Sequence, residues 1–382
     1  MRFALHSAPH AARGARSQAT PSALPAARAA HPPPARLRHC RAAAAAADSP
    51  ATPSERLRLL SGSAHEPLAR EIAAYLGIPL TGVLSKRFAD GEVYVQVLES
   101  VRGCDVFLVQ PTCAPVADTL MELMLLVDAC RRASAATITL VLPYFGYSRA
   151  DRKSSAREAI AAKLVANLLT ESGADRVLGL DLHSGQLEGY FDIPMVHVGA
   201  GTLLADYISH KIPAADLVVV SPDVGGVSRA RRFAKTLSDA PLAIIDKRRT
   251  GHNQAQVMNL LGDVAGRDAV LIDDMIDTAG TLLAGAELLH AKGARSVYAV
   301  ASHALFSGPA CERLGGGLFK EVIVTNSIPV PPDKRFPQLT VLSVADLLGE
   351  AIKRMAAGLS VETVERTTSP GFVGRPVVKT ME

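Results

Sequence analysis

The sequence predicts an α/β fold made of two similar domains. Three observations support this prediction. Short apolar or β-branched runs of strand length recur along the chain, stretches with helical spacing separate them, and one strand and helix pattern repeats about 160 residues later. Strands separated by helices of this length form right-handed parallel units, with helices on both faces of the sheet.

The expected strands follow from residue patterns in chain order. Val93, Val95 and Val97 alternate with polar residues, which is typical of a half-buried strand. The run 106–109 is continuously apolar, as in a strand covered on both faces. Similar apolar or β-branched runs predict strands at 138–142, 177–180, 217–220, 242–245, 270–272, 297–300 and 322–324.

Helices are expected between these strands. Two sets of apolar residues have helical spacing: Leu120, Leu123, Met124 and Val127 in the first, and Leu164, Leu168 and Leu169 in the second. Gly173 follows the second set and is typical of a helix end.

The internal repeat places a domain boundary near residues 195–215. The strand at 106–110 with its following helix corresponds to the strand at 270–273 with its own helix. We therefore expect a transit peptide or disordered segment at 1–53, an N-terminal domain at 54–205, a C-terminal domain at 206–360 and a tail at 361–382.

Composition excludes several classes of protein. Hydrophobic residues make up 48% and charged residues 20% of the 382 residues, which excludes a largely disordered chain. No stretch approaches the roughly 18 to 20 apolar residues of a membrane-spanning helix, so no membrane association is expected. With no Trp and 4% aromatic residues, no nucleic-acid partner is predicted. The 5 scattered cysteines lack a CxxC pair, which excludes a disulfide scaffold and a cysteine zinc site.

Residues 1–47 differ from the rest of the chain. They contain Arg, Ala, Pro and Ser in abundance and no Asp, Glu or Lys, which is typical of an organelle transit peptide. A permanent basic arm is the alternative. Pro and Ser favour a plastid, and therefore its stroma, while the Arg density also allows a mitochondrion. Because this segment carries much of the positive charge, the rest of the chain is mildly acidic.

The most informative stretch is 270–281, with the sequence VLIDDMIDTAGT. An apolar strand is expected to end in two carboxylates, followed by a loop that opens a helix, and helix N-termini bind phosphate through free backbone N–H groups. The carboxylates can accept hydrogen bonds from sugar hydroxyls. The stretch therefore predicts a pentose 5-phosphate site made of Asp273, Asp274, Asp277, Thr278, Ala279, Gly280 and Thr281. A solvated acidic turn is the alternative.

This stretch resembles the 5-phosphoribosyl 1-pyrophosphate fingerprint, which phosphoribosyltransferases and phosphoribosyl pyrophosphate synthetases share. Further segments make the whole of about 56–355 resemble the synthetases, of the plant and algal plastid type. These are FADGE at 88–92, PYFGYSRADRK at 143–153, DLHSGQ at 181–186, SPDVGG at 221–226 and DKRR at 246–249. The resemblance implies two phosphoribosyltransferase-like domains, the first binding ATP and the second ribose 5-phosphate.

The resemblance also implies residue roles. It assigns catalysis to Lys247 and Arg249, because diphosphoryl transfer requires cations that stabilise the charge of the transition state. It implies Mg²⁺ as cofactor, with Asp223 as its ligand and His183 near Mg·ATP, although imidazole is a poor ligand for a hard cation and His183 could instead act through water or an ATP phosphate. Asp181 is a third predicted ligand, with orientation of the His183 side chain as the alternative role. The predicted ATP-binding residues are Phe88, Asp90, Gly91, Glu92, Arg149, Asp151 and His183.

The expected activity is transfer of the diphosphoryl group of Mg·ATP to the 1-hydroxyl of ribose 5-phosphate, giving AMP. The resemblance implies a homo-oligomer, commonly a hexamer. Val196 stands where the family usually carries Asp, which bears on subunit contacts and on regulation by phosphate or ADP. The alternatives are a phosphoribosyltransferase, which would not need the DKRR segment, and a non-catalytic regulatory subunit, which would not need Lys247 and Arg249.

Overall fold

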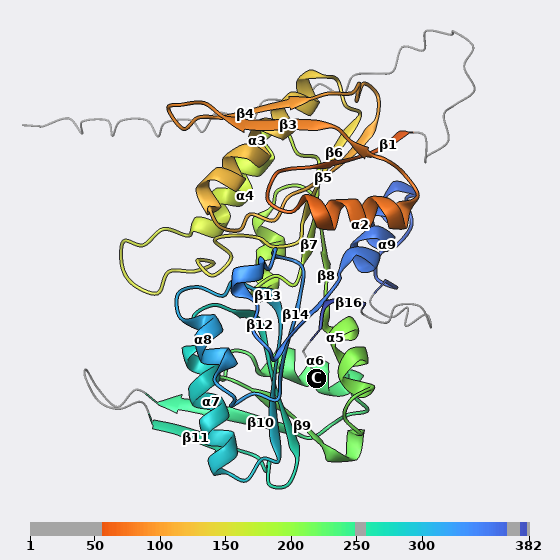
Figure 1. Cartoon of the computed structure of the whole chain (residues 1–382). Helices are drawn as coiled ribbons and strands as arrows, with labels where there is room; N and C mark the ends of the chain where they lie inside the picture. Colours follow the sequence, from red (N-terminus) through yellow and green to blue (C-terminus); the bar gives the residue numbers. More distant parts are fainter. Residues whose placement is uncertain (1–55, 249–256, 365–374, 380–382) are drawn as a thin grey trace, which may run out of the picture. The chain divides into compact units, whose positions relative to one another are not determined.

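The computed structural model describes residues 56–248, 257–364 and 375–379 (Figure 1). The first sheet is entirely parallel, in the order β2-β1-β5-β6-β7-β8. Its strands are β1 (Leu57–Ser61), β2 (Leu80–Thr81), β5 (Asp105–Val109), β6 (Thr137–Leu142), β7 (Arg176–Leu180) and β8 (Met195–Val198). Its helices are α2 (Glu66–Leu76), α3 (Val116–Arg132) and α4 (Ala161–Ser172), with a 3₁₀ turn at Gly185–Tyr190.

A separate antiparallel hairpin joins β3 (Val83–Arg87) and β4 (Val93–Val97). Figure 1 shows the hairpin beside α3, with the residues between its strands at the tip. The alternating valines of β4 are half-buried, as the sequence predicted for this strand. The hairpin therefore presents residues 88–92 at the edge of the N-terminal half.

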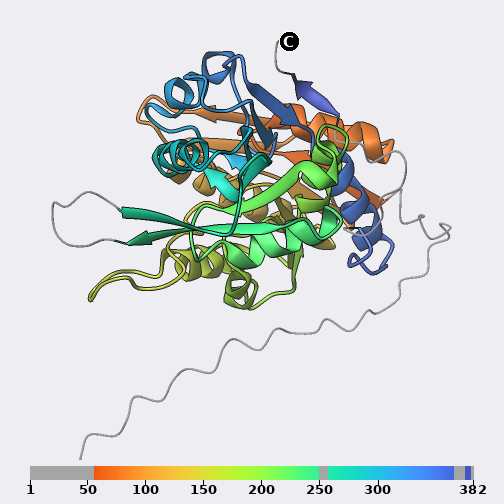
Figure 2. The ribbon, with the colours of Figure 1, turned by 90° about the horizontal axis from the view of Figure 1, so that it is seen from below.

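The second sheet has the order β11-β10-β9-β12-β13-β14-β15-β16 and is parallel except at its two edge strands. Its strands are β9 (Leu217–Ser221), β10 (Leu242–Arg248), β11 (Val257–Leu261), β12 (Asp268–Ile276), β13 (Ser296–Ala304), β14 (Glu321–Thr325), β15 (Leu339–Leu342) and β16 (Pro376–Val378). The helices of this half are α5 (Gly201–Ser209), α6 (Val227–Thr236), α7 (Gly280–Ala291), α8 (Ala310–Gly315) and α9 (Ala345–Ala356), with 3₁₀ turns at Ala214–Asp216 and Pro332–Lys334. Figure 2 shows β10 and β11 projecting together from this sheet.

The two mostly parallel sheets flanked by helices confirm the predicted α/β class. The predicted domain limits, 54–205 and 206–360, stay a prediction, because one hydrophobic core cluster includes Leu178 and Val198 of the first sheet and Val219 and Val270 of the second. Residues 375–379, within the predicted tail, contain edge strand β16. No helix in the described ranges is long and apolar enough to cross a membrane.

Strand β12 differs from the prediction in one respect that matters for the site. The sequence predicted that the strand ends in the carboxylate pair, but the paired residues continue two positions further, to Ile276. Asp273 pairs with Ala301 and Met275 with His303 in the neighbouring strand β13. The hydrogen bonds of the parallel ladder extend the strand because β13 is equally long, which the apolar run alone did not reveal. Asp273 and Asp274 therefore lie within strand β12 and not in the loop that follows it.

Candidate active site

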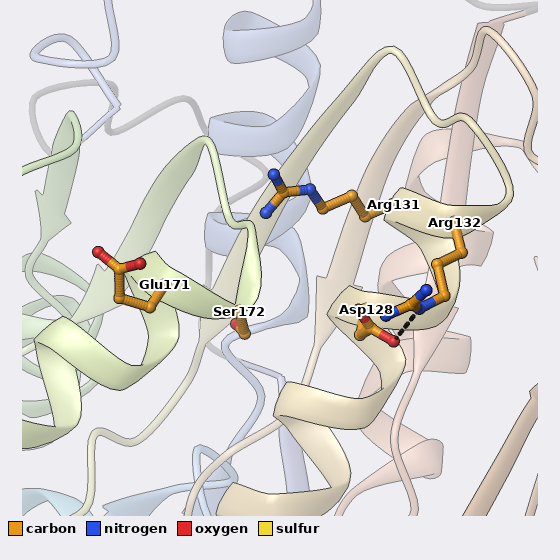
Figure 3. Close-up of a pocket in the computed structure, with 5 residues that line it drawn as sticks. All are labelled: Asp128, Arg131, Arg132, Glu171 and Ser172. Carbon is orange, nitrogen blue, oxygen red and sulfur yellow. Dashed lines mark hydrogen bonds and ion pairs between the residues drawn. The ribbon is translucent and has the colours of Figure 1, made fainter. Parts of the chain in front are cut away.

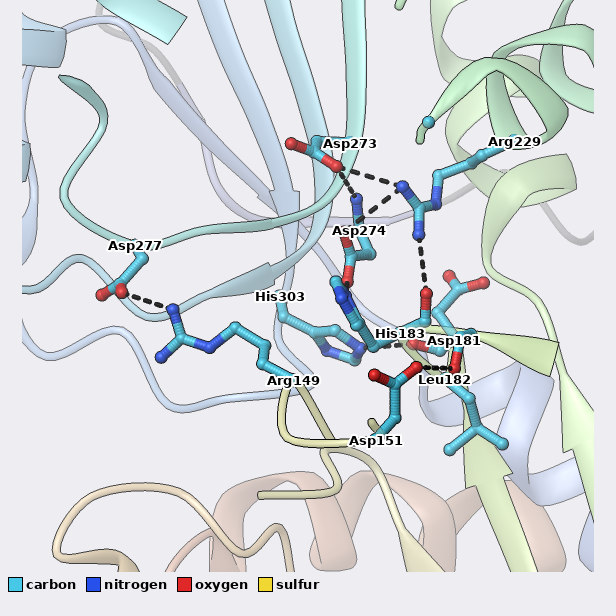
Figure 4. Close-up of polar contacts among 12 residues, drawn as sticks. Arg149, Asp151, Asp181, Leu182, His183, Arg229, Asp273, Asp274, Asp277 and His303 are labelled. Carbon is cyan, nitrogen blue, oxygen red and sulfur yellow. Dashed lines mark hydrogen bonds and ion pairs between the residues drawn. The ribbon is translucent and has the colours of Figure 1, made fainter. Parts of the chain in front are cut away.

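The carboxyl ends of β7 and β12 meet at a cluster of charged side chains (Figure 4). His183, in the loop after β7, has its Nδ1 2.7 Å from Oδ2 of Asp274 in β12. Arg229, in the first turn of α6, has one guanidinium nitrogen 3.0 Å from Asp273 and 3.3 Å from Asp274. A second nitrogen donates to the His183 carbonyl at 3.3 Å. The predicted sugar-binding carboxylates thus lie between a histidine and an arginine.

Charge and burial set the protonation of this cluster. Burial raises the pKa of Asp274, but the hydrogen bond from His183 and the charge of Arg229 outweigh it and hold that pKa well below its usual range. Burial and the neighbouring Asp274 charge raise the pKa of Asp273. The hydrogen bond to Asp274 raises the pKa of His183 above 6.5. Asp274 is therefore the firmly ionised member of the pair.

Asp181 lies beside the cluster but contacts other groups. Its Oδ2 accepts from the backbone N–H of Ala200 at 2.9 Å and from the Ser302 hydroxyl. The fully buried His303 has its Nε2 3.0 Å from the Asp181 carbonyl. These bonds fix the loop that begins with Asp181, which has a positive φ of 39°. The partner of the His183 ring is Asp274 rather than Asp181.

The predicted ATP-binding loop after β6 contacts both halves of the molecule. The Arg149 guanidinium donates to Asp277 at 2.7 Å. Asp151 is buried and accepts from Ser184 at 2.7 Å and from Gln186 at 2.8 Å, so it fixes the turn that follows His183. The structure therefore brings Arg149 to the predicted phosphate loop and Asp151 to the turn that follows His183.

The predicted phosphate loop connects β12 to α7. Ala279 precedes the helix with a left-handed φ of 58°, which a residue other than glycine adopts at a cost. Arg313 of α8 donates to the Thr278 carbonyl at 2.8 Å. Gly280 and Thr281 begin α7, so their backbone N–H groups belong to the four at the helix start that lack intrahelical partners. This geometry suits an anion at the helix N-terminus.

The hairpin residues lie apart from this cluster. Phe88 is 47% exposed and its ring is 5.6 Å from that of Tyr94, with the Lys86 ammonium over both rings. Oδ1 of Asp90 accepts from the Glu92 backbone N–H at 3.1 Å, and Gly91 has a φ of 96° that favours glycine. Within the described residues, no hydrogen bond or ion pair joins these side chains to the His183 cluster.

The predicted metal ligands do not converge. No group of three or more His, Cys, Asp or Glu side chains in the described ranges is arranged to hold a metal. Asp223 is exposed after β9, and its Oδ1 accepts from the Gly226 backbone N–H at 2.8 Å. One exposed carboxylate fits Mg²⁺, which commonly takes one or two protein carboxylates together with waters and substrate phosphates. Asp181 fits less well because its carboxylate is already hydrogen-bonded.

The predicted catalytic residues lie at the limit of the described chain. Lys247 lies in strand β10, where its backbone pairs with that of Met258 in β11. Arg249 lies outside the described residues. The charged pocket shown in Figure 3, lined by Asp128, Arg131, Arg132, Glu171 and Ser172 at the ends of α3 and α4, shares no residue with the predicted site.

Comparison with known proteins identifies the family. Residues 57–173 match the N-terminal domain of ribose phosphate pyrophosphokinase, and residues 248–366 match the phosphoribosyl synthetase-associated domain. The chain is 66% identical over 310 residues to ribose-phosphate pyrophosphokinase 1, chloroplastic, of Arabidopsis thaliana, covering 81% of this chain and 77% of that protein. The chain belongs to the ribose-phosphate pyrophosphokinase family.

Other ribose-phosphate pyrophosphokinases agree over similar lengths. The chain is 62% identical over 315 residues to the ribose-phosphate pyrophosphokinase of Nostoc sp., covering 82% of this chain and 95% of that protein. The crystal structure of phosphoribosylpyrophosphate synthetase from Mycobacterium smegmatis superimposes with a TM-score of 0.76 at 44% identity. That match covers 79% of this chain and 99% of the other, so the two-domain pyrophosphokinase fold extends through both halves.

Three residues that contact the predicted site were absent from the sequence prediction. Arg229 lies in the charged run RARR, His303 is an isolated histidine near the end of strand β13, and Arg313 lies in the short helix α8. Arg229 occurs six residues after Asp223, on the helix that follows the same strand. That position beside a predicted metal ligand was the one available signal.

Proposed function

We propose that this enzyme transfers the β,γ-diphosphoryl group of ATP to the 1-hydroxyl of ribose 5-phosphate. The new bond joins the sugar O1 to the β-phosphorus, the bond from that phosphorus to the bridging oxygen of AMP breaks, and the hydroxyl proton is released. The products are 5-phosphoribosyl 1-pyrophosphate and AMP, for nucleotide biosynthesis. The observation that carries this proposal is the contact of the predicted ATP loop with the predicted sugar-phosphate loop through Arg149 and Asp277.

In this proposal the C-terminal half binds the pentose. Asp273 and Asp274 accept hydrogen bonds from the sugar hydroxyls, and residues 278–281 bind the 5-phosphate at the start of α7. Arg229 and His183 neutralise the carboxylates before the neutral hydroxyls arrive. Because β12 continues through the pair, the two acceptors are held in place without reorganisation.

The N-terminal half binds ATP. Arg149 reaches its phosphates, and Phe88, Asp90, Gly91 and Glu92 bind the adenine end. Asp151 supports the loop that carries His183. Lys247 and Arg249 stabilise the charge that develops on the moving diphosphoryl group and on AMP, where cations in a dry site are most effective.

Mg²⁺ is the proposed cofactor, and it neutralises phosphate charge when bound. Asp223 is the residue that would hold it, with the substrate phosphates and waters as the other oxygen donors. Nδ1 of His183 is occupied by Asp274, which leaves Nε2 to contact an ATP phosphate or a bound water. Asp181 acts by holding the His183 loop.

We further propose that the enzyme assembles as a homo-oligomer, by resemblance a hexamer, and acts in the plastid stroma. The plastid location is supported by the chloroplastic name of the Arabidopsis relative and by the composition of residues 1–47, which lie outside the described residues. The family match begins only at residue 57.

Incubation of the protein with ribose 5-phosphate and Mg·ATP, followed by separation of nucleotides, tests the activity. We expect AMP in equal amount to 5-phosphoribosyl 1-pyrophosphate, and none when ribose replaces ribose 5-phosphate. Pyrophosphate release from 5-phosphoribosyl 1-pyrophosphate and a free base would instead indicate a phosphoribosyltransferase. Substrate binding without turnover would indicate the regulatory subunit.

A further inference from the structure

One ion pair joins the predicted ATP site to the predicted sugar-phosphate site. Nη1 of Arg149, in the loop after β6, lies 2.7 Å from Oδ2 of Asp277, in the loop after β12. The two residues are 128 positions apart in the sequence. Figure 4 shows the pair set apart from the group formed by Asp273, Asp274 and Arg229. The third acid of the fingerprint therefore has a different neighbour from the first two.

Asp277 accepts hydrogen bonds from two protein side chains, those of Ser307 and Arg149. Its carboxylate interacts with Ser307 as well as Arg149, and its backbone carbonyl accepts from the Ser307 N–H at 3.0 Å. Burial raises the pKa of Asp277, but the hydrogen bonds from Ser307 and Arg149 outweigh it and lower that pKa, so the carboxylate is ionised. The Asp277 carboxylate is thus bound to Arg149 of the N-terminal half.

The loop that carries Arg149 is itself anchored on the C-terminal half. The ring of Tyr144, at the start of this loop, lies edge-on to His303 with 5.0 Å between the ring centroids. Tyr144 also packs in a small buried cluster with Cys113, Met275 and Ile328. Met275 lies two residues before Asp277 on β12. The ion pair therefore forms between two segments that are already packed together.

Arg149 has N–H donors that do not contact Asp277 and that can bind a ligand. A guanidinium carries five N–H donors in a fixed fork, and the contact with Asp277 uses one nitrogen. The Arg149 side chain is 54% exposed, so its other donors can reach a ligand. Holding a long side chain in place before binding removes the entropy cost of ordering it, which is about 0.5 to 1.5 kcal/mol for one side chain and corresponds to about twofold to tenfold in affinity.

We propose that Asp277 is a positioning residue for ATP rather than a ligand of the sugar phosphate. This inference rests on the proposed function, because it takes ATP as the ligand of Arg149. Asp277 orients the guanidinium toward the ATP phosphates and links that orientation to the loop that binds the second substrate.

The test compares Asp277→Asn with the wild-type chain. Titration calorimetry with ATP in the presence of Mg²⁺ should show about fivefold weaker binding, and the KM for ATP should rise by a similar factor. The KM for ribose 5-phosphate should stay within about twofold, since no sugar contact is lost. Asp277→Glu, which keeps the charge, should recover part of the ATP affinity. Asp192→Asn is the matched control, because it breaks the exposed Lys163–Asp192 ion pair elsewhere and should change neither constant.

A double variant separates positioning from direct binding. If Asp277 acts through Arg149, then Arg149→Gln with Asp277→Asn should bind ATP no more weakly than Arg149→Gln alone. Additive losses, tighter ATP binding by Asp277→Asn, or an increase confined to the KM for ribose 5-phosphate would each overturn the inference. Calorimetry measures ATP binding without turnover. A protein that binds ATP but forms no AMP would therefore contradict the proposed function, and the comparison of ATP affinities would still test the role of Asp277.

Discussion

Two adjacent carboxylates in one strand repel each other unless cations lie close by. Arg229 contacts both Asp273 and Asp274, and His183 contacts Asp274 alone, so the pair is unequal. Asp274 is nearly fully buried, with its side chain 4% exposed, whereas that of Asp273 is 26% exposed. Asp273 is therefore the member of the pair that is more open to a substrate.

The first prediction concerns Asp273. Asp273→Asn keeps the shape of the side chain but replaces the two carboxyl oxygens with one amide oxygen and an NH₂ group that can only donate. We expect the KM for ribose 5-phosphate to rise about tenfold, because a buried hydroxyl left without its acceptor costs about 1 to 3 kcal/mol. Steady-state kinetics with each substrate varied in turn will measure it. An unchanged KM for the sugar, with a raised KM for ATP, would contradict the assignment.

The second prediction concerns Lys247. Lys247→Ala should lower kcat about a hundredfold while both KM values change little, because a cation used in the transition state contributes little to ground-state binding. Lys235→Ala, which removes an exposed lysine from the last turn of α6, is the control and should retain normal turnover. Turnover of Lys247→Ala equal to that control would show that Lys247 is not catalytic.

Regular elements were more predictable than their contacts. The runs at 106–109, 138–142 and 177–180 match β5, β6 and β7 closely, because strands covered on both faces are continuously apolar. The sequence prediction did not include β8 or β15, whose runs of four residues are short. In α4, Leu169 is buried but Leu164 and Leu168 are 56% and 41% exposed, so helical spacing alone did not identify the buried face.

The part of the site that local sequence patterns determine was predictable, and the part that long-range contacts determine was not. A strand, a loop and a helix start are local features, so the sequence indicated where residues 273–281 would lie. The contact of Arg229 with the carboxylates joins segments that are 44 residues apart, and the contact of Arg149 with Asp277 spans 128. The first contact depends on how α6 packs against its own sheet and the second on how the two sheets pack, and no local pattern encodes either.

A third prediction follows from the start of helix α2. His65 caps this helix, with its Nδ1 accepting from the Leu68 backbone N–H at 3.3 Å. An accepting Nδ1 must be unprotonated, and burial lowers the pKa of His65 from 6.5 to about 4. Between those values the unfolded chain binds a proton that the folded chain does not. The free energy of unfolding should therefore decrease as the pH falls from 6.5 to about 4, by up to about 3 kcal/mol.

Urea unfolding of the wild type and of His65→Asn at a series of pH values tests this prediction. Asparagine is a good N-cap and does not titrate, so the variant should keep the helix and lose this part of the pH dependence. The difference in unfolding free energy between the two proteins should shift in favour of the variant below pH 6.5. A difference that stays constant from pH 7 to pH 4 would contradict the linkage to His65.

At the scale of the whole molecule, the two halves contact each other at the candidate active site and through a shared hydrophobic core. A further contact joins α2 to α9, where the Tyr75 hydroxyl donates to Glu350 at 2.9 Å, and the hydroxyl of Ser343, just before α9, donates to Glu71. A Cβ on Gly349 of α9 would lie 2.4 Å from the Tyr75 ring, so the close approach of these helices requires glycine there. The carboxyl ends of both sheets are thereby held against each other, as a reaction between two substrates requires.

The last prediction concerns residues 1–47. They precede the family match, which begins at residue 57, and every predicted site residue lies after them. Deleting them should leave the specific activity and the thermal midpoint unchanged, because no apolar periodicity in them could pack on a core. Fusing them to a fluorescent reporter should direct it to the plastid. Sequencing the N-terminus of the protein purified from its own cells should find a start at about residues 40 to 56. An intact Met1 or Arg2 in that protein, together with salt-sensitive binding to polyanions, would show a permanent basic arm instead.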